Sequence, residues 1–146
     1  MKPYPHVYGV TASGAASGTV AISAPGLPPL EAAPPPEFDG PPGYWSPETL
    51  LVAAAANCFL LTFRAVARGA ALEWTGIDCE VEGTLERVGG VTRFTRFATR
   101  ATLAVPPGTD LEIARRLLER AEAACLISNS LNGERTLDAQ VHEKGV

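Results

Sequence analysis

The sequence has few cysteines and histidines, the side chains that most often bind zinc. Its 146 residues include three cysteines and two histidines, and no Cys-x-x-Cys pair occurs among them. A structural zinc site usually takes four such ligands lying close together, so we expect no bound metal. A phosphate-binding loop is not expected either, because Gly14 and Gly18 fall in a predicted hairpin turn and not between a strand and a helix. We therefore expect no cofactor.

The sequence also lacks an excess of positive charge and a long unbroken apolar run. Its net charge of -4, from 12 basic and 16 acidic side chains, gives no basic field of the kind that attracts nucleic acid. The longest apolar run, Leu50 to Leu61, contains Asn57 and is shorter than the roughly 20 residues of a membrane span. Prolines and polar residues interrupt the N-terminus, unlike a signal peptide. These absences predict a cytoplasmic protein that binds neither nucleic acid nor membrane.

The cysteines are too few and too widely spaced to form the disulfide framework of a small secreted domain. With 146 residues, 46% of them hydrophobic, the chain can fold around its own core without covalent links. We therefore predict a single domain over residues 1–146. If two of the cysteines pair, the bond is expected to be functional and reversible.

The N-terminal third predicts little regular structure. Residues 4–24 alternate loosely between apolar and polar types, which indicates a hairpin with a long turn at Thr11 to Gly18. Residues 25–47 contain nine of the 13 prolines, which cannot donate to a sheet ladder. This segment is predicted to be a surface loop with one short strand near Leu27 to Glu31.

A helix is predicted to begin at Ser46 and to end near Gly69. Serine is a favoured N-cap, proline suits the first helical position, and Glu48 favours the positive end of the helix dipole. From Leu50 to Phe63 the helix is apolar on nearly every face. This pattern predicts a helix that is buried on all sides.

The remaining sequence predicts two strands, a helix and a final strand. Strands at Ile77 to Val88 and Val91 to Val105 are joined by a two-glycine turn. A capping box starting at Thr109 opens a second helix that is expected to end near Asn129. Arg135 to His142 form the closing strand, so the fold class is α+β.

Cys58 lies in the first predicted helix and Cys125 near the end of the second, 67 residues apart. Only the tertiary fold can bring them together. Free cysteine is among the most buried residue types, so packing is the simpler interpretation of both residues taken alone. Cys79, within a predicted strand, is interpreted as a packing residue.

The sequence around two of the cysteines resembles the OsmC/Ohr family. The family's first helix has an Asn-Pro-Glu-like start and reaches its reactive cysteine in an Ala-rich Cys-Phe context, and SPETLLVAAAANCF at residues 46–59 is similar. Its second cysteine is followed by proline, a hydrophobic residue and serine. Here Cys125-Leu126-Ile127-Ser128 keeps all of these except the proline.

The resemblance implies a fold of antiparallel sheets wrapped around a buried central helix, with a second helix, in an intertwined homodimer. It implies reduction of organic hydroperoxides, in which Cys58 is the peroxidatic thiolate and Cys125 resolves its sulfenic acid as a disulfide. Such capture protects a sulfenic acid from irreversible overoxidation. Glu48 would have a supporting role, and the electrons would come from a dithiol such as a lipoylated protein.

Ten residues separate Glu48 from Cys58 in the predicted helix. At about 1.5 Å per residue they are roughly 15 Å apart, too far for contact within one chain. One hypothesis is that Glu48 acts across a dimer, on the partner subunit's Cys58. The alternative is that Glu48 only stabilises the helix N-terminus.

The main departure from the family is a missing arginine, which family peroxidases use to stabilise the thiolate. Residues 1–63 contain no arginine, and Glu37-Phe38-Asp39-Gly40 places a carboxylate where the cation is expected. A buried cysteine without a positive partner has a raised pKa and a smaller thiolate fraction. The alternative function is therefore an OsmC-fold binding or scaffold protein with weak or lost peroxidase activity.

Overall fold

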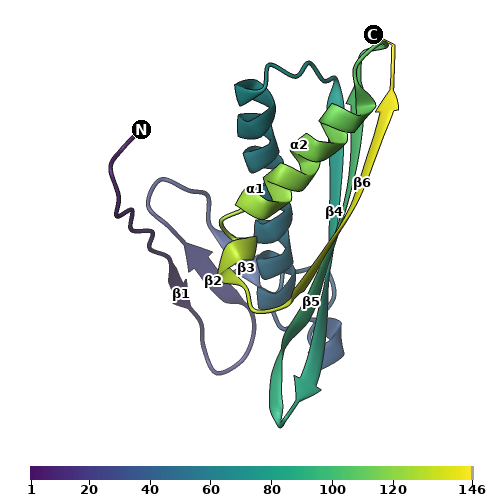
Figure 1. Ribbon diagram of the computed structural model, residues 1–146. Coiled ribbons are helices and arrows are strands. Elements are labelled where there is room, and N and C mark those ends of the chain that lie inside the picture. Colours follow the sequence, from purple (N-terminus) through teal and green to yellow (C-terminus); the bar gives the residue numbers. More distant parts are fainter. Residues whose placement is uncertain (146) are drawn as a thin grey trace. The chain divides into compact units, whose positions relative to one another are not determined.

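The computed structural model describes residues 1–145 and divides the chain into two compact units, Met1–Leu51 and Val52–Val146. Two helices and two three-stranded sheets confirm the α+β class (Figure 1). That the chain forms one domain stays a prediction. In chain order the elements are β1 (Thr11–Ser13), β2 (Val20–Ser23), β3 (Leu30–Ala32), η1 (Pro36–Phe38), α1 (Pro47–Gly69), β4 (Gly76–Val88), β5 (Val91–Val105), α2 (Leu111–Ala124), η2 (Ser128–Ser130) and β6 (Glu134–Glu143).

The first unit contains an antiparallel sheet in the order β1-β2-β3. The predicted hairpin is present, but its turn is shorter than expected because Thr11–Ser13 pair with β2. The short strand also forms later than expected, at Leu30–Ala32. Pro28 and Pro29 lack the N–H that a ladder needs, so pairing begins after them.

The start and end predicted for α1 are confirmed. The backbone N–H of Thr49 donates to Ser46 Oγ at 3.1 Å, and the N–H of Ser46 donates back to Thr49 Oγ1 at 2.9 Å. Two helix-terminal donors are thereby satisfied reciprocally, with Thr49 in the place that Glu or Gln takes in a capping box.

The expectation that α1 is buried on all sides is wrong for the single chain. Its buried residues form one stripe at intervals of four, and Leu61 on another face is 50% exposed. The apolar run from Leu50 to Leu61 is shorter than a membrane span. The complete helix, however, is long and apolar enough to cross a membrane by length and composition alone, with 22% of its most apolar window buried. An apolar sequence shows that a helix avoids water, but it does not show how much of the helix surface the same chain covers. The buried stripe consists of Ala55, Phe59, Phe63 and Ala67.

Strands β4 and β5 form a long antiparallel hairpin. It turns at Gly89 and Gly90, whose φ angles of 60° and 81° are of the kind that a type I′ turn requires. A bulge between Thr84 and Leu85 shifts the register, so that Thr84 pairs with Arg96 but Leu85 with Phe94. The bulge brings charged residues three positions apart to the same face, which explains why β5 lacks a strict alternation.

The sheet of the second unit is not wholly antiparallel, which corrects the expected arrangement. Its order is β4-β5-β6, and β6 runs parallel to β5. Parallel neighbours need a crossover connection, which α2 provides. Figure 1 shows α2 lying across α1 beside this sheet. Helix α2 carries the chain back along the sheet, so β6 starts at the same end as its partner.

Both helices pack against one face of this sheet and form the core of the second unit. Phe63 is completely buried and meets Trp74 edge to face, with ring centroids 5.6 Å apart. Leu137, Ala139 and Val141 of β6 pack against the same cluster, as their alternation predicts.

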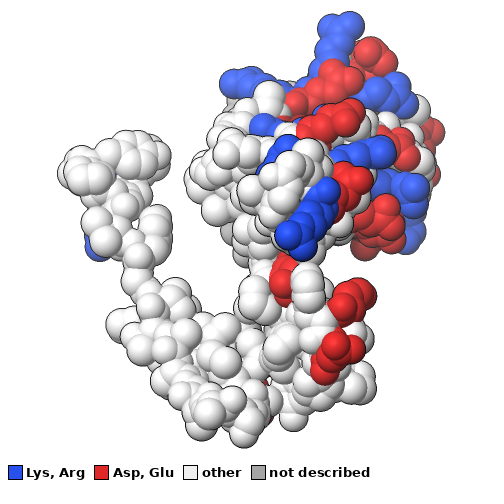
Figure 2. Space-filling model, turned by 90° about the horizontal axis from the view of Figure 1, so that it is seen from below, with Lys and Arg blue, Asp and Glu red and all other residues white. Residues whose placement is uncertain are grey.

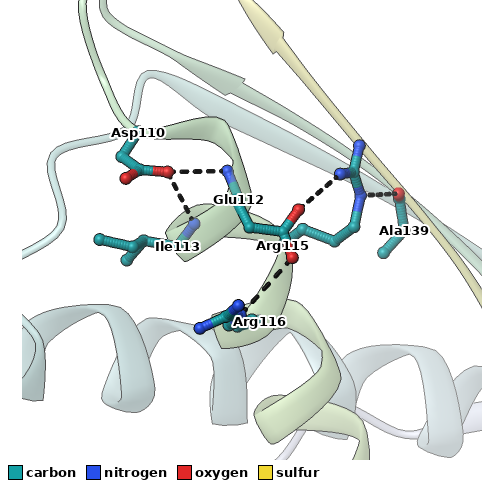
Figure 3. Close-up of polar contacts among 6 residues, drawn as sticks. All are labelled: Asp110, Glu112, Ile113, Arg115, Arg116 and Ala139. Atoms are coloured by element: carbon teal, nitrogen blue, oxygen red, sulfur yellow. Dashed lines mark hydrogen bonds and ion pairs between the residues drawn. The ribbon is translucent and has the colours of Figure 1, made fainter.

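The second helix begins one residue later than predicted. Its N-cap is Asp110, whose Oδ1 accepts from the N–H groups of Glu112 and Ile113 at 3.0 and 3.1 Å (Figure 3). Arg115 Nε donates to the carbonyl of Ala139, at 3.4 Å, on edge strand β6. The helix ends at Ala124, not near Asn129, because Cys125 has left the helical conformation.

Charge is distributed unevenly along the chain. Among residues 1–51 only Lys2 and four acidic residues are charged, and both signs mix through the rest of the sequence. In Figure 2 the blue and red side chains accordingly gather over the second unit on the face shown. A single-sign field of the kind that attracts nucleic acid is not formed on this face.

We predict that Phe63→Ala lowers the free energy of unfolding by about 3–5 kcal/mol, because it leaves a cavity in the core. Urea denaturation measures the change. The control is Val91→Ala, whose side chain is 59% exposed and whose cost should be about 0.5 kcal/mol. Equal costs for the two substitutions would contradict this description of the core.

Candidate functional site

The candidate site is built around Cys58, on a face of α1 next to the buried stripe. The thiol is half-buried, and its Sγ lies 3.9 Å from Oγ1 of Thr62, one helical turn later. Cys58 opens onto a mainly apolar groove of about 520 Å³. The groove is lined by Ala54, Asn57, Cys58, Leu61, Thr62, Ala65, Leu126 and Ile127.

The fold brings Cys125 to Cys58. Cys125 is the C-cap of α2 and is fully buried. Its thiol lies close enough to Cys58 for each thiol to shift the pKa of the other, and all three cysteines are free. The sequence separation of 67 residues gave no sign of this contact. It arises because α2 crosses α1 and ends beside it.

The surroundings of Cys58 favour its thiolate. Burial alone raises its pKa, but the backbone N–H of Ile127, the Cys125 thiol, the Thr62 hydroxyl and the N–H of Leu126 together hold the pKa below its ordinary value. Hydrogen bonds to the charged form have this effect on any acid. Neutral donors therefore lower the pKa of Cys58 in a chain that has no arginine before residue 64.

The other two thiols are shifted the opposite way. Burial raises the pKa of Cys125, hydrogen bonds from Ser128 oppose the rise, and the adjacent Cys58 adds to it. Burial also raises the pKa of Cys79 to about 11, with further contributions from the negative charge of Glu122 and from Cys125. Of the three cysteines, Cys58 has the surroundings of a nucleophile.

Glu48 lies apart from the thiol pair, in the first turn of α1. It borders a separate apolar hollow within the first unit, of about 520 Å³. Its Oε2 is buried and has no hydrogen-bond partner in the described part of the chain. Glu37, near the expected place of the family arginine, is exposed in η1. Within the described residues Glu48 forms no ion pair, whereas a buried charge normally has a partner of opposite sign.

Sequence reasoning did not identify several groups around Cys58. Thr62 could have been found, since residues four apart share a helix face. The N–H groups of Leu126 and Ile127 carry no sequence signal, because every residue except proline has one. Only the absence of proline at position 126 hinted that such a donor exists there.

We predict that Leu126→Pro raises the pKa of Cys58, because it deletes one N–H donor. Cys125 has φ -65° and ψ 106°, an extended conformation that suits a residue before proline. Alkylation of Cys58 by iodoacetamide at neutral pH should slow by about three- to tenfold, since one pKa unit is tenfold in thiolate. Leu126→Ala keeps the N–H and should leave the pKa unchanged. A pKa that shifts equally in both variants would refute the role of this donor.

Comparisons with known proteins show the family of this chain. Residues 40–139 match the family model of the OsmC-like proteins. The chain is 33% identical over 104 residues to peroxiredoxin OsmC of Escherichia coli, covering 71% of each. It is 30% identical over 112 residues to the uncharacterized protein YmaD of Bacillus subtilis, covering 73% of this chain and 75% of that one.

A solved structure supports the same assignment. The organic hydroperoxide resistance protein OsmC of Legionella pneumophila superimposes with a TM-score of 0.78 at 26% identity, covering 94% of this chain and 99% of that one. The sequence match and the shared fold agree. The chain belongs to the OsmC-like protein family.

Proposed function

We propose that this protein is a thiol-dependent peroxidase that reduces organic hydroperoxides, with Cys58 as the peroxidatic thiolate and Cys125 as the resolving thiol. The observation that carries the proposal is the contact between these two thiols, in which the pKa of Cys58 is lowered and that of Cys125 is raised. The family includes peroxiredoxins and organic hydroperoxide resistance proteins.

In the first step, the Cys58 thiolate attacks the outer oxygen of the hydroperoxide. The O–O bond breaks, the alkoxide takes up a proton and leaves as an alcohol, and Cys58 becomes a sulfenic acid. In the second step, the sulfur of Cys125 attacks the sulfenic sulfur, and the hydroxyl leaves as water. A disulfide forms, which an external dithiol reduces by exchange.

The assignment of roles follows from the protonation of the two thiols. A lowered pKa provides thiolate at Cys58, and only the thiolate attacks a peroxide. Cys125 stays protonated and donates its hydrogen bond to Cys58 until the sulfenic acid has formed. Cys79, with a pKa of about 11, carries too little thiolate to compete.

The groove at Cys58 suits a substrate with an alkyl or aryl group. Its lining is mainly aliphatic, and the side chains of Leu61 and Leu126 are 50% and 65% exposed there. Covering these side chains with a hydrocarbon group removes apolar surface from water, which hydrogen peroxide cannot do. This difference favours organic over inorganic peroxides.

We also propose that the protein is a cytoplasmic, single-domain homodimer reduced by a dithiol such as a lipoylated protein. The exposed apolar faces of α1 support the dimer, since a second copy would remove them from water. The unpaired oxygen of Glu48 supports an action of Glu48 on the partner subunit's Cys58. Beside that thiol, the carboxyl group of Glu48 can donate a proton to the departing alkoxide.

A second candidate is an OsmC-fold binding or scaffold protein with weak or lost peroxidase activity. The observation that favours it is the absence of arginine from residues 1–63. A cation stabilises a thiolate and the developing charge on a peroxide in ways that neutral donors match only in part. The groove would then hold an apolar ligand without turnover.

We predict that the protein consumes cumene and tert-butyl hydroperoxide when dihydrolipoamide is the reductant. Cys58→Ser should abolish turnover, and Cys125→Ser should allow one turnover before Cys58 overoxidises. Cys79→Ser, the matched control, should keep wild-type turnover. Absence of turnover, with thiols that survive the peroxide, would contradict the peroxidase and support the binding protein.

We predict a dimer in size-exclusion chromatography with light scattering, and a turnover that falls about tenfold or more in Glu48→Gln. The control is Glu37→Gln, because Glu37 is exposed in η1. A stable monomer would refute the action of Glu48 across subunits. Equal turnover in the two variants would leave Glu48 with only a stabilising charge at the helix N-terminus.

A further inference from the structure

The segment between α2 and β6 is fixed by one partly buried arginine. Arg135 Nε forms an ion pair with Glu122 Oε1 at 2.8 Å, and their side chains are 24% and 14% exposed. In every other ion pair of the described residues, both side chains are at least 42% exposed. Exposed pairs contribute little because water and salt screen them. The Arg135 pair is the one with the geometry to constrain the backbone.

The guanidinium of Arg135 contacts the chain at two points, Glu122 in the last turn of α2 and Asn129 in η2. Its Nη1 donates to Asn129 Oδ1 at 2.7 Å, and its Nη2 donates to the backbone carbonyl of Glu122. Asn129 in turn donates through Nδ2 to the carbonyl of Ala123 at 3.1 Å. A planar fork of donors holds several acceptors in a fixed relative geometry. Arg135 thereby joins the last turn of α2 to η2.

The residues enclosed between these two attachment points are the ones that surround the Cys58 thiol. Cys125 provides the second thiol, Leu126 and Ile127 line the groove beside Cys58, and their backbone N–H groups lower the pKa of Cys58. A backbone donor is useful to a thiolate only while the backbone stays in place. With leucine at position 126, no proline ring fixes φ there, so the constraint must come from contacts such as those of Arg135.

We propose that Arg135 is a positioning residue for the thiol pair: it holds the turn formed by Cys125, Leu126 and Ile127 against Cys58. The proposal rests on the proposed thiol chemistry and adds a residue to it. Arg135 acts through the turn. Its guanidinium keeps the backbone of the turn in place, and the neutral N–H groups of the turn stabilise the thiolate.

Removal of the guanidinium has two physical consequences. The turn loses three donated hydrogen bonds, two of them to Glu122. The Oε1 atom of Glu122 loses its partner. Its Oε2 atom is already buried and unpaired among the described residues, so the whole carboxylate is then without a partner. An unpaired buried charge is strongly unfavourable, so the end of α2 must move toward water. That movement withdraws the donors from Cys58.

The test measures the rate of alkylation of Cys58 by iodoacetamide against pH, read at the Cys58 peptide by mass spectrometry. Arg135→Met should move the midpoint to higher pH and slow alkylation at neutral pH by about tenfold, which corresponds to one pKa unit. Arg135→Lys keeps the charge without the fork and should give an intermediate midpoint. The matched control, Arg100→Met, removes another strand arginine with two carboxylate partners and should leave the midpoint unchanged.

A folded Arg135→Met variant with the wild-type midpoint would overturn the proposal. If that variant does not fold, Asn129→Ala decides, because it removes one attachment point from an exposed side chain. A raised midpoint in Asn129→Ala supports the positioning role, and an unchanged midpoint overturns it. Alkylation requires no peroxide, so a protein without peroxide turnover whose midpoint still depends on Arg135 would refute the peroxidase and keep the positioning role.

Discussion

The contact between Cys58 and the turn that follows α2 is the interaction on which the proposed thiol chemistry depends. It exists only because both helices pack on the same face of the β4-β5-β6 sheet and α2 crosses α1 before it ends. The crossover also requires β6 to return parallel to β5. The environment of the Cys58 thiol therefore depends on both the sheet topology and the packing of the two helices.

In a chain without arginine in residues 1–63, activation of the proposed nucleophile Cys58 depends on how its hydrogen-bond donors are arranged. A single guanidinium stabilises a thiolate by its charge. Here the N–H groups of Ile127 and Leu126, together with two side-chain donors, outweigh the burial of Cys58. Such donors are individually weak, so their effect depends on a backbone that does not move. The partly buried contacts of Arg135 meet this requirement from outside the groove.

Two features of α1 lack a partner among the described residues: its exposed apolar faces and the buried oxygen of the Glu48 carboxylate. An apolar helix with one buried stripe is unfavourable in water, and so is a carboxylate oxygen that is buried without a partner among residues 1–145. The homodimer proposed above would cover the apolar faces and provide a partner for this oxygen. Both features belong to α1, the same helix that carries Cys58.

Short-range signals in the sequence were sufficient to predict the local structure: Ser46 and Pro47 start α1, two glycines turn the β4-β5 hairpin, and alternation identifies the inward face of β6. These signals act over a few residues, where capping and turn geometry decide the outcome. The family resemblance then pointed to Cys58 and Cys125. The tertiary structure alone decided that β6 is parallel, that α1 is only partly buried, and that backbone N–H groups surround Cys58. The physical reason is that these features depend on contacts between distant segments and on main-chain groups, which every sequence contains alike.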